Sequence, residues 1–484
     1  MLHRNRRKIR TFCRLCAKRR LFFRGKRAII AGLRLRGRLS ETGVIMYRDL
    51  TKGNITKGLL LFALPMIAGN LLQQFYNIAD TLIVGQALGK NALAAVGSAY
   101  TLMTFLTSIF LGLSMGAGAL FSIYLGKKDY GALRSAVHHA LVLIFAVTAA
   151  LNVLVYAFLD PILRFLQIPD ELYSSMREYL VIIFAGLIAT FLYNFFACLL
   201  RAVGNSVAPL WFLGTSALLN IALDLLFVLV FSWGIAGAAI ATVFAQYVAG
   251  IGITVYAGRR CREFLPGKED RRFSRKILSE ILDLSLLTCA QQSAMNFGIL
   301  LIQRLVDSFG PVTMAAFAAA VKIDSFAYLP VQDFGNAFST YIAQNYGAKE
   351  RGRIRAGLKS AVCISMAFCI VISALVFAFA RPLMALFVDA GEREVILEGV
   401  GYLRIEGAFY CGIGCLFLLY GLYRALGKPG MSVVLTVISL GTRVALAYLL
   451  SAIPTVGVTG IWWSVPIGWG LADLVGFLYY KAKK

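Results

Sequence analysis

Long apolar runs separated by short polar connections dominate this chain. A search of its 484 residues for apolar stretches of about 20 residues, the length that crosses about 30 Å of hydrocarbon, gives twelve candidates. They cover 58–85, 92–125, 137–159, 178–200, 207–232, 235–257, 279–306, 313–345, 357–388, 398–422, 430–452 and 457–480. Because a helix satisfies its own backbone hydrogen bonds in lipid, we predict an all-α integral membrane protein with twelve transmembrane helices.

Composition excludes most other classes of protein. Hydrophobic residues make up 59% of the chain and charged residues 15%, whereas soluble domains are about a quarter charged. We find no nucleophile–base arrangement, and the nine cysteines and three histidines show no metal-binding spacing. No motif for ATP hydrolysis is present either. The sequence therefore predicts a protein that is not an enzyme and has no cofactor, so any energy that it needs must come from an ion gradient.

Lysine and arginine residues are concentrated in alternate connections. Of the 49 in the chain, 40 lie before the first apolar run, after the last run, or in every second connection between them. Basic connections stay in the cytoplasm, so both termini are expected inside the cell, and an even number of helices agrees with that. The predicted location is the inner (plasma) membrane, crossed many times.

The net charge of +25 has a local origin. Residues 1–45 contain 15 lysines and arginines and one acid, and the rest follows the bias of the cytoplasmic connections. This distribution argues against nucleic acid as a partner. The segment could contact anionic membrane lipid or act as a transit peptide. We interpret residues 1–45 as a basic N-terminal extension, disordered or not native, and expect translation from Met46 to give an active protein.

An internal repeat relates the two halves of the sequence. A shift of 221 residues places Gly89 on Gly310, and downstream a shift of 223 places "RAVG" (201–204) on "RALG" (424–427). Six helices therefore occur twice. Because six is even, both copies keep one orientation, which predicts two six-helix bundles related by a pseudo-two-fold axis along the membrane normal. The predicted organisation is an N-terminal lobe (46–257), a basic cytoplasmic linker (258–276) and a C-terminal lobe (277–484).

The first apolar run contains an isolated acid, Asp80, in the stretch "YNIADTLIVG". Gln73, Tyr76, Asn77 and Asp80 share one helical face, and a polar face on a membrane helix is expected to line a cavity or the bundle interior. Pro65 removes a backbone hydrogen bond from the same helix and makes it bendable.

Further polar positions occur in the fifth and sixth runs. Asn220 and Asp224 are four residues apart in the fifth run, and Thr242 lies in the sixth. Two buried carboxylates close together cannot both be ionised and unpaired, so either a proton or an oxygen-liganded cation such as Na⁺ would sit there. A polar cluster that only holds helices together is the structural alternative.

The repeat provides an internal control for these residues. In the second half, Asp80 is replaced by Leu301. The counterparts of Asn220, Asp224 and Thr242 are, in that order, Arg443, Ala447 and Val465. Every proposed ligand is lost there, and one is replaced by a cation. We therefore predict a single coupling-ion site in the first half, with no other metal.

Three stretches carry a resemblance to a known family. "ALPMIAGNLLQQFYNIADTLIVGQALGKNALAAVG", "LLNIALDLLF…WGIAGAAIATV" and "VKIDSFAYLPVQDFGNAFSTYIAQNYGAKE" closely resemble segments of multidrug and toxic compound extrusion (MATE) transporters, and the likeness extends over about residues 48–480. The resemblance implies efflux of amphipathic, often cationic drugs in exchange for H⁺ or Na⁺.

In the DinF-like prokaryotic branch of that family, the coupling site lies in the N-terminal lobe. The resemblance assigns that role to Asp80, Asn220, Asp224 and Thr242, with Gln73, Tyr76 and Asn77 on the supporting polar face and substrate cavity, and Pro65 as the bending point. Another branch has an acid in the seventh span. No carboxylate occurs between Asp283 and Asp307 here, which argues against that branch.

Several matters stay open at this level. Asp324 and Glu406 could pair with Lys322 or Arg443, or shape the polarity of the drug site, and Asp333 has no assigned role. The alternative function is a flippase of lipid-linked saccharides, which would gather several basic residues in its cavity. A channel would need a continuous polar pore. Nothing in the sequence sets the oligomeric state, and a monomer is expected.

Overall fold

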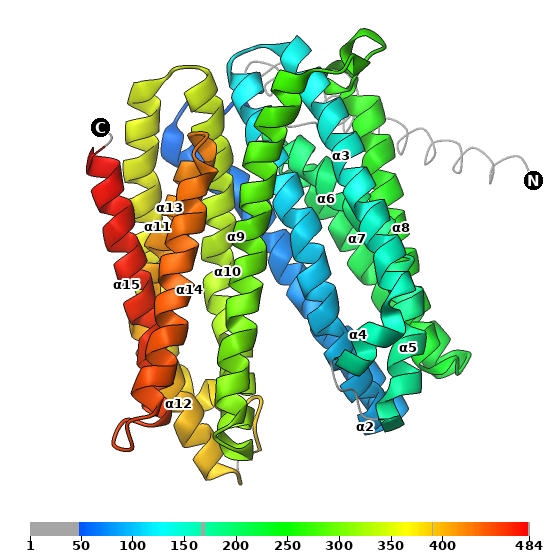
Figure 1. Ribbon diagram of the computed structural model, residues 1–484, viewed down its shortest axis with the longest axis vertical. Helices are drawn as coiled ribbons and strands as arrows, with labels where there is room; N and C mark the ends of the chain where they lie inside the picture. Colours follow the sequence, from blue (N-terminus) through cyan, green and yellow to red (C-terminus); the bar gives the residue numbers. More distant parts are fainter. Residues whose placement is uncertain (1–47, 166–169, 390, 483–484) are drawn as a thin grey trace, which may run out of the picture. The chain divides into compact units, whose positions relative to one another are not determined.

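The computed structural model describes residues 48–165, 170–389 and 391–482, and this part of the chain contains helices and no β-strand (Figure 1). The predicted extension, residues 1–45, lies outside the described residues. The first half holds α2 (Ile55–Gly126), α3 (Tyr130–Ala157), α4 (Leu159–Phe165), α5 (Asp170–Phe184), α6 (Leu187–Ala202), α7 (Val207–Asp224), η1 (Leu225–Val230) and α8 (Gly234–Arg260). Two short turns, η2 (Arg262–Phe264) and η3 (Glu269–Arg271), follow.

The second half has the matching series of helices. It holds α9 (Arg275–Asp307), α10 (Pro311–Gly347), α11 (Arg351–Met384), α12 (Arg393–Ala408), α13 (Tyr410–Ala425), α14 (Pro429–Ser451) and α15 (Val458–Ala482). We call α2–α8 the N-half and α9–α15 the C-half. These bounds are compatible with the predicted lobes and linker, whose limits stay a prediction.

The described residues contain ten helices that are long and apolar enough to cross a membrane, and two bent helix pairs that bring the number to twelve. The bent pairs correspond to the predicted runs 178–200 and 398–422. The first bends by 45° between α5 and α6, and the second by 53° between α12 and α13. The breaks lie at Gly186 and Phe409, which the 223-residue shift superimposes. Hydropathy identifies an apolar run, but it does not show whether the helix formed by that run is bent.

Backbone geometry repeats with the sequence. Gly89 interrupts α2 with φ 82°, and its counterpart Gly310 precedes α10 with φ 101°. Lys128 and Lys349 both end a helix with positive φ, at 59° and 60°. Non-glycine residues rarely adopt this region, so recurrence at matched positions shows that the two halves are copies of one backbone plan.

Local sequence sets several helix starts. The side chain of Asn54 accepts a hydrogen bond from the backbone N–H of Lys57 and caps α2, and Asp129 caps α3 in the same way. Ser274 caps α9. Pro311 and Pro429 occupy the first turns of α10 and α14, where the missing N–H has no partner to lose. The starts of α2, α3, α9 and α14 lie in or beside basic connections, whereas Pro311 starts α10 at the opposite end.

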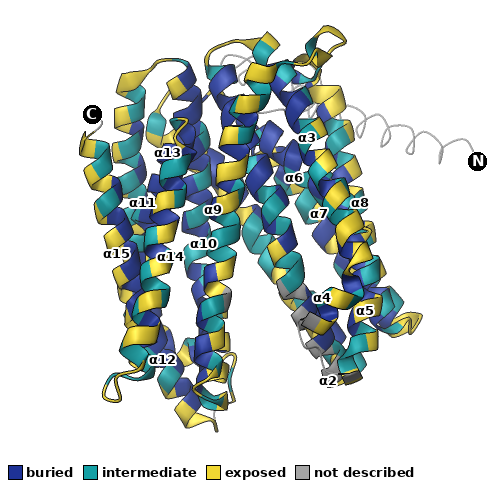
Figure 2. Ribbon diagram, in the orientation of Figure 1, coloured by how far each residue is buried: buried dark blue, intermediate teal, exposed yellow. Residues whose placement is uncertain are grey.

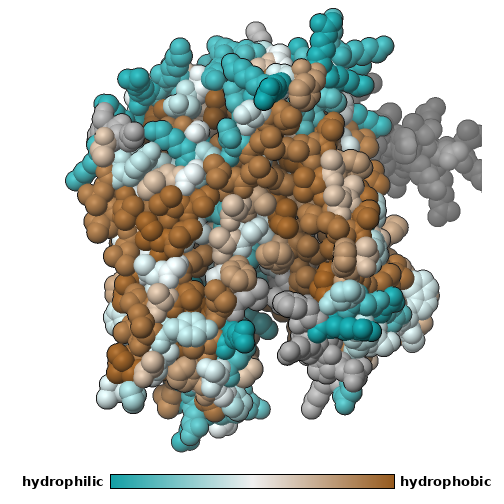
Figure 3. Space-filling view, viewed as in Figure 1, coloured by the Kyte–Doolittle hydropathy of each residue, from teal (hydrophilic) through white to brown (hydrophobic). Residues whose placement is uncertain are grey.

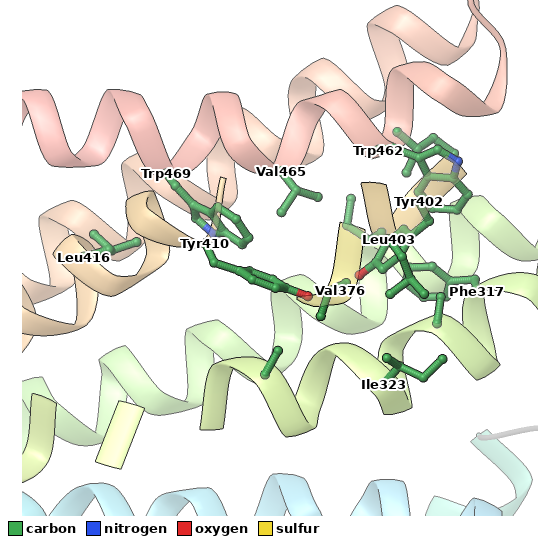
Figure 4. Close-up of a cluster of buried hydrophobic side chains, with 14 of the residues drawn as sticks. Phe317, Ile323, Val376, Tyr402, Leu403, Tyr410, Leu416, Trp462, Val465 and Trp469 are labelled. Atoms are coloured by element: carbon green, nitrogen blue, oxygen red, sulfur yellow. The ribbon is translucent and has the colours of Figure 1, made fainter. Parts of the chain in front are cut away.

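In the described residues the C-half has one apolar core, the N-half has two, and a further core joins the halves. In the C-half, Phe317 stacks on Trp462, and Tyr402 packs edge-on against both rings (Figure 4). The joining core contains Leu59 and Phe62 of α2 together with Phe338 and Ile342 of α10. Buried residues follow this seam, whereas exposed residues are frequent on the outer faces (Figure 2).

The halves are in contact at the end that carries the linker, which we call the linker end. Gln344 of α10 donates from Nε2 to the carbonyl oxygen of Ala202 at 2.8 Å and accepts from the backbone N–H of Leu50 at 3.3 Å. At the opposite end the surface is hollowed between the halves (Figure 3). Hydrophobic side chains form a broad belt on the face shown there, as expected for a surface in contact with lipid.

Candidate functional site

A cleft of about 570 Å³ lies between the N-half and the C-half. Its walls come from α2, α5, α6, α7, α8, α9, α10 and α13, so both halves contribute. This volume is within the range of about 300–1,000 Å³ that is usual for drug-sized ligands. The position of the cleft between the two copies of the repeat is where a transporter that works by relative movement of the copies would bind its substrate.

The polar face predicted on the first apolar run lines this cleft. Gln73, Tyr76, Asn77 and Asp80 all contribute to its wall, and so does Pro65 nearer the linker end. The i, i+3, i+4, i+7 spacing therefore identified the side of the helix that faces the cavity. Phe75, on another side of α2, contacts Phe326 of α10 with ring centroids 5.6 Å apart, and so joins the halves.

Asp80 and Asp224 lie beside each other although 144 positions separate them in sequence. Asp80 is half-buried at the cleft wall, and Asp224 is completely buried behind it. Both oxygens of Asp224 and Oδ1 of Asp80 have no hydrogen-bond partner. Unpartnered carboxylate oxygens away from water are costly, so this pair is suited to bind a proton or a cation.

Asn220 and Thr242 complete the cluster. Nδ2 of Asn220 donates to Oγ1 of Thr242 at 3.2 Å, and Oδ1 of Asn220 is a fourth unpartnered oxygen in this cluster. Thr242 lines the cleft, whereas Asn220 is buried behind it. The four predicted residues thus come together from three helices, α2, α7 and α8. Carboxylate, amide and hydroxyl oxygens form the set that hard cations such as Na⁺ prefer.

Two features of this cluster were missed by sequence reasoning. Directly after Asp224 the helix widens into a π-helix over Leu225–Val230, a form that is frequent at functional sites. Tyr179 of α5 lies close enough to Asp80 and Asp224 to interact with both. The repeat could have drawn attention to Tyr179, because the shift of 223 residues places it on Tyr402. Tyr402 belongs to a second acidic cluster.

That second cluster lies in the C-half. Asp324 of α10 and Glu406 of α12 interact with each other and with Arg443, and the hydroxyl of Tyr402 donates to Glu406 at 2.8 Å. Of the two cations considered for these acids, Lys322 is exposed and Arg443 is the partner. The Tyr410 hydroxyl also points into this cluster, facing that of Tyr402 (Figure 4). An internal cation balances one of these acids, unlike the Asp80–Asp224 pair.

Four charged side chains line the cleft within the described residues. Asp80 belongs to the cluster already described. Asp333 of α10, Arg201 of α6 and Arg424 of α13 lie nearer the linker end. The cleft therefore presents both signs of charge, at different depths.

The fold and this site define a membrane transporter with two repeated helical halves around a central cleft. A family model described as MatE matches residues 65–226 and again residues 288–449, which agrees with the internal repeat. The chain belongs to this family, the MATE multidrug efflux transporters.

Curated relatives cover nearly the whole chain. A probable multidrug resistance protein YpnP of Bacillus subtilis is 30% identical, over 90% of this chain and 96% of its own length. A probable multidrug resistance protein NorM of Thermotoga maritima is 24% identical over 84% of this chain and 88% of its own length. The multidrug export protein MepA of Staphylococcus aureus is 22% identical over 88% of this chain and 94% of its own length.

Solved structures share the fold. The outward-facing conformation of a multidrug resistance MATE family transporter superimposes with a TM-score of 0.85 at 23% identity, over 91% of this chain and 98% of that one. A mutant of the Vibrio cholerae MATE transporter VcmN gives a TM-score of 0.83 at 23% identity, over 90% of this chain and 98% of that one.

Proposed function

We propose that this protein is an antiporter that exports amphipathic, often cationic drug-like molecules in exchange for H⁺ or Na⁺. The observation that carries this proposal is the Asp80–Asp224 pair, with unpartnered oxygens next to a drug-sized cleft. Its multidrug resistance and export relatives support the substrate class.

Exchange follows from competition for the same carboxylates. Two neighbouring carboxylates repel each other, so the empty pair favours uptake of one positive charge. A proton shared between them would form the hydrogen bond that two carboxylates cannot make, and Na⁺ would instead take oxygens from Asp80, Asp224, Asn220 and Thr242. Because Asp80 also lines the cleft, binding of the ion there alters the wall that the drug contacts.

Alternating access requires the halves to separate at one end at a time. The halves contact each other at the linker end, and the cleft opens toward the opposite end (Figure 3). The basic connections at the linker end favour a cytoplasmic position for it and for both termini, in the inner (plasma) membrane. The described form then opens to the outside, and rocking of the halves would expose the cleft to the cytoplasm.

The experiment that tests this function uses purified full-length protein in liposomes. Efflux of a cationic dye is measured under an imposed H⁺ gradient and, separately, an imposed Na⁺ gradient. We expect one gradient to drive dye movement against its concentration, and Asp80→Asn to abolish this while the protein still inserts and folds. Dye movement at wild-type rates by this variant, or movement that neither gradient drives, contradicts the proposal.

A flippase of lipid-linked saccharides is less well supported. Such a protein needs several basic side chains along the cavity, and in the described residues only Arg201 and Arg424 line the cleft. The carboxylate of Asp80 lines the same cleft and would repel phosphate groups.

A further inference from the structure

Two arginines at matched positions of the repeat lie at the linker end of the cleft. Arg201 is in the last turn of α6 and Arg424 in the last turn of α13, and the shift of 223 residues superimposes them. Both line the cleft, and both lie within electrostatic range of the Cys198 thiol. Positive charge in the wall of a cleft of low dielectric constant attracts an anion strongly.

Neutral groups hold the guanidinium of Arg424. Its Nε donates to Oγ of Ser339 at 3.3 Å, and its Nη2 donates to Oδ1 of Asn336 at 2.9 Å. The residue is 5% exposed, and none of the three ion pairs in the described residues includes it. A charged side chain within a membrane protein is usually paired, because an unpaired buried charge is costly.

The acid that lines this part of the cleft, Asp333, interacts with the other arginine. Asp333 of α10 interacts with Arg201 and with the amides of Asn70 and Asn336, and its Oδ2 has no hydrogen-bond partner. Nε of Arg201 also lacks a partner. Two guanidinium groups and one carboxylate therefore line this end of the cleft, and one positive charge there is unbalanced.

We propose that Arg201 and Arg424 form a subsite for an anionic group on the transported molecule, which extends the proposed function and rests on it. Guanidinium forks bind carboxylate and phosphate groups through two parallel hydrogen bonds. The same cleft presents Asp80 and its polar face to a cationic group. The substrate class that matches both ends is an amphipathic zwitterion with separated charges.

The test compares two dyes of one shape that differ in a single charge. Rhodamine B carries a free carboxylate beside its cationic ring system, and its ethyl ester carries only the cation. Affinity of the full-length protein for each dye is measured by fluorescence anisotropy in phosphatidylcholine nanodiscs without an ion gradient. The variants are Arg424→Gln, Arg201→Gln and, as a matched control, Lys322→Gln, which removes an exposed charge outside the cleft.

We expect Arg424→Gln and Arg201→Gln each to weaken binding of rhodamine B by about tenfold or more, and to leave binding of the ester unchanged within about twofold, since only the carboxylate uses the arginines. Arg424→Lys should give an intermediate loss. Equal losses for both dyes would assign the arginines a structural role and overturn the subsite. Unchanged binding of rhodamine B, or no binding of it by the wild type, would also overturn it.

Two further measurements separate the remaining explanations. Repeating the titration with phosphatidylglycerol added to the nanodiscs distinguishes a lipid headgroup from a substrate. Loss of rhodamine B binding in those discs, with the ester unaffected, would assign the arginines to lipid and overturn the substrate assignment. Gradient-driven efflux of the ester tests the antiporter separately, because that function can hold when the subsite fails, and selective binding can hold when efflux fails.

Discussion

Gly126 and Gly347 make the same contact from opposite sides of the pseudo-two-fold axis. A Cβ on Gly126 would overlap the backbone carbonyl of Gln344, and a Cβ on Gly347 would overlap that of Ile123. The shift of 221 residues superimposes both the two glycines and the two carbonyl residues. Here the ends of α2 and α10 meet backbone to backbone, so this crossing holds the two halves in close contact at the linker end.

We predict that Gly126→Ala or Gly347→Ala opens the linker end. Each methyl group meets backbone that cannot turn aside, and overpacking of this kind typically costs about 1–3 kcal/mol. Only the form with the linker end closed bears this cost, so the population of the opposite form should rise by about tenfold for each 1.4 kcal/mol. Spin labels at exposed Tyr130 and Arg351, in a background without native cysteines, report the separation by pulsed electron resonance.

Gly131→Ala and Gly352→Ala are the matched controls for that experiment. These residues are also superimposed by the shift of 221, and they lie beside the same connections with open space or ordinary contact where a Cβ would stand. We expect distance distributions like that of the wild type for both. A wild-type distribution for the Gly126 and Gly347 variants as well would contradict the role of the crossing.

A second prediction concerns the two acids of the N-half. Asp224→Asn should impair ion uptake nearly as much as Asp80→Asn, because the two carboxyl groups titrate as a unit. The double substitution should add little to either single one, as expected for residues in direct contact. The measurement is ion flux per transported dye in liposomes. Additive losses would show that the carboxylates act independently.

A third prediction separates the C-half cluster from coupling. Asp324→Asn or Glu406→Gln should leave ion flux per dye intact, because one acid still balances Arg443. The double substitution leaves that guanidinium without an acid, which typically costs about 3–5 kcal/mol in stability. Thermal unfolding in detergent measures this cost. Uncoupled transport by either single variant, with normal coupling in Asp224→Asn, would move the ion site to the C-half.

A fourth prediction concerns residues 48–53, which cross the linker end ahead of α2. Arg353 of α11 donates to the carbonyl oxygens of Leu50 and Lys52 at 3.2 Å and to that of Gly53 at 3.0 Å. Arg353→Gln should release this segment, since hydrogen bonds from charged groups contribute about 1.5–3 kcal/mol, or about ten- to a hundredfold in the opening equilibrium.

Trypsin cleavage after Lys52 in the folded protein measures that release. The exposed Arg355, two residues further along α11, provides the control Arg355→Gln with the same loss of charge. We expect faster cleavage only in the Arg353 variant. Equal cleavage rates in both variants would mean that the buried Leu50 side chain holds the segment without help from Arg353.

Much of the architecture follows from the sequence alone. The apolar runs predict the helices, because burial of about 20 apolar residues in hydrocarbon is a property of each segment by itself. The repeat relates Gly89 to Gly310 and Lys128 to Lys349, and the structure confirms this in their positive φ angles. Spacing within one helix also predicted that Gln73, Tyr76, Asn77 and Asp80 share the side that lines the cleft.

Only the tertiary structure determined relations between helices. In the structure, Asp224 lies beside Asp80, and Tyr179 interacts with both. Arg443 balances Asp324. Each of these relations depends on how the helices are rotated against their neighbours. The bends at Gly186 and Phe409 are likewise features that only the tertiary structure determined. Periodicity gives the face of a helix but not the direction in which that face points, because packing of side chains distant in sequence sets the rotation.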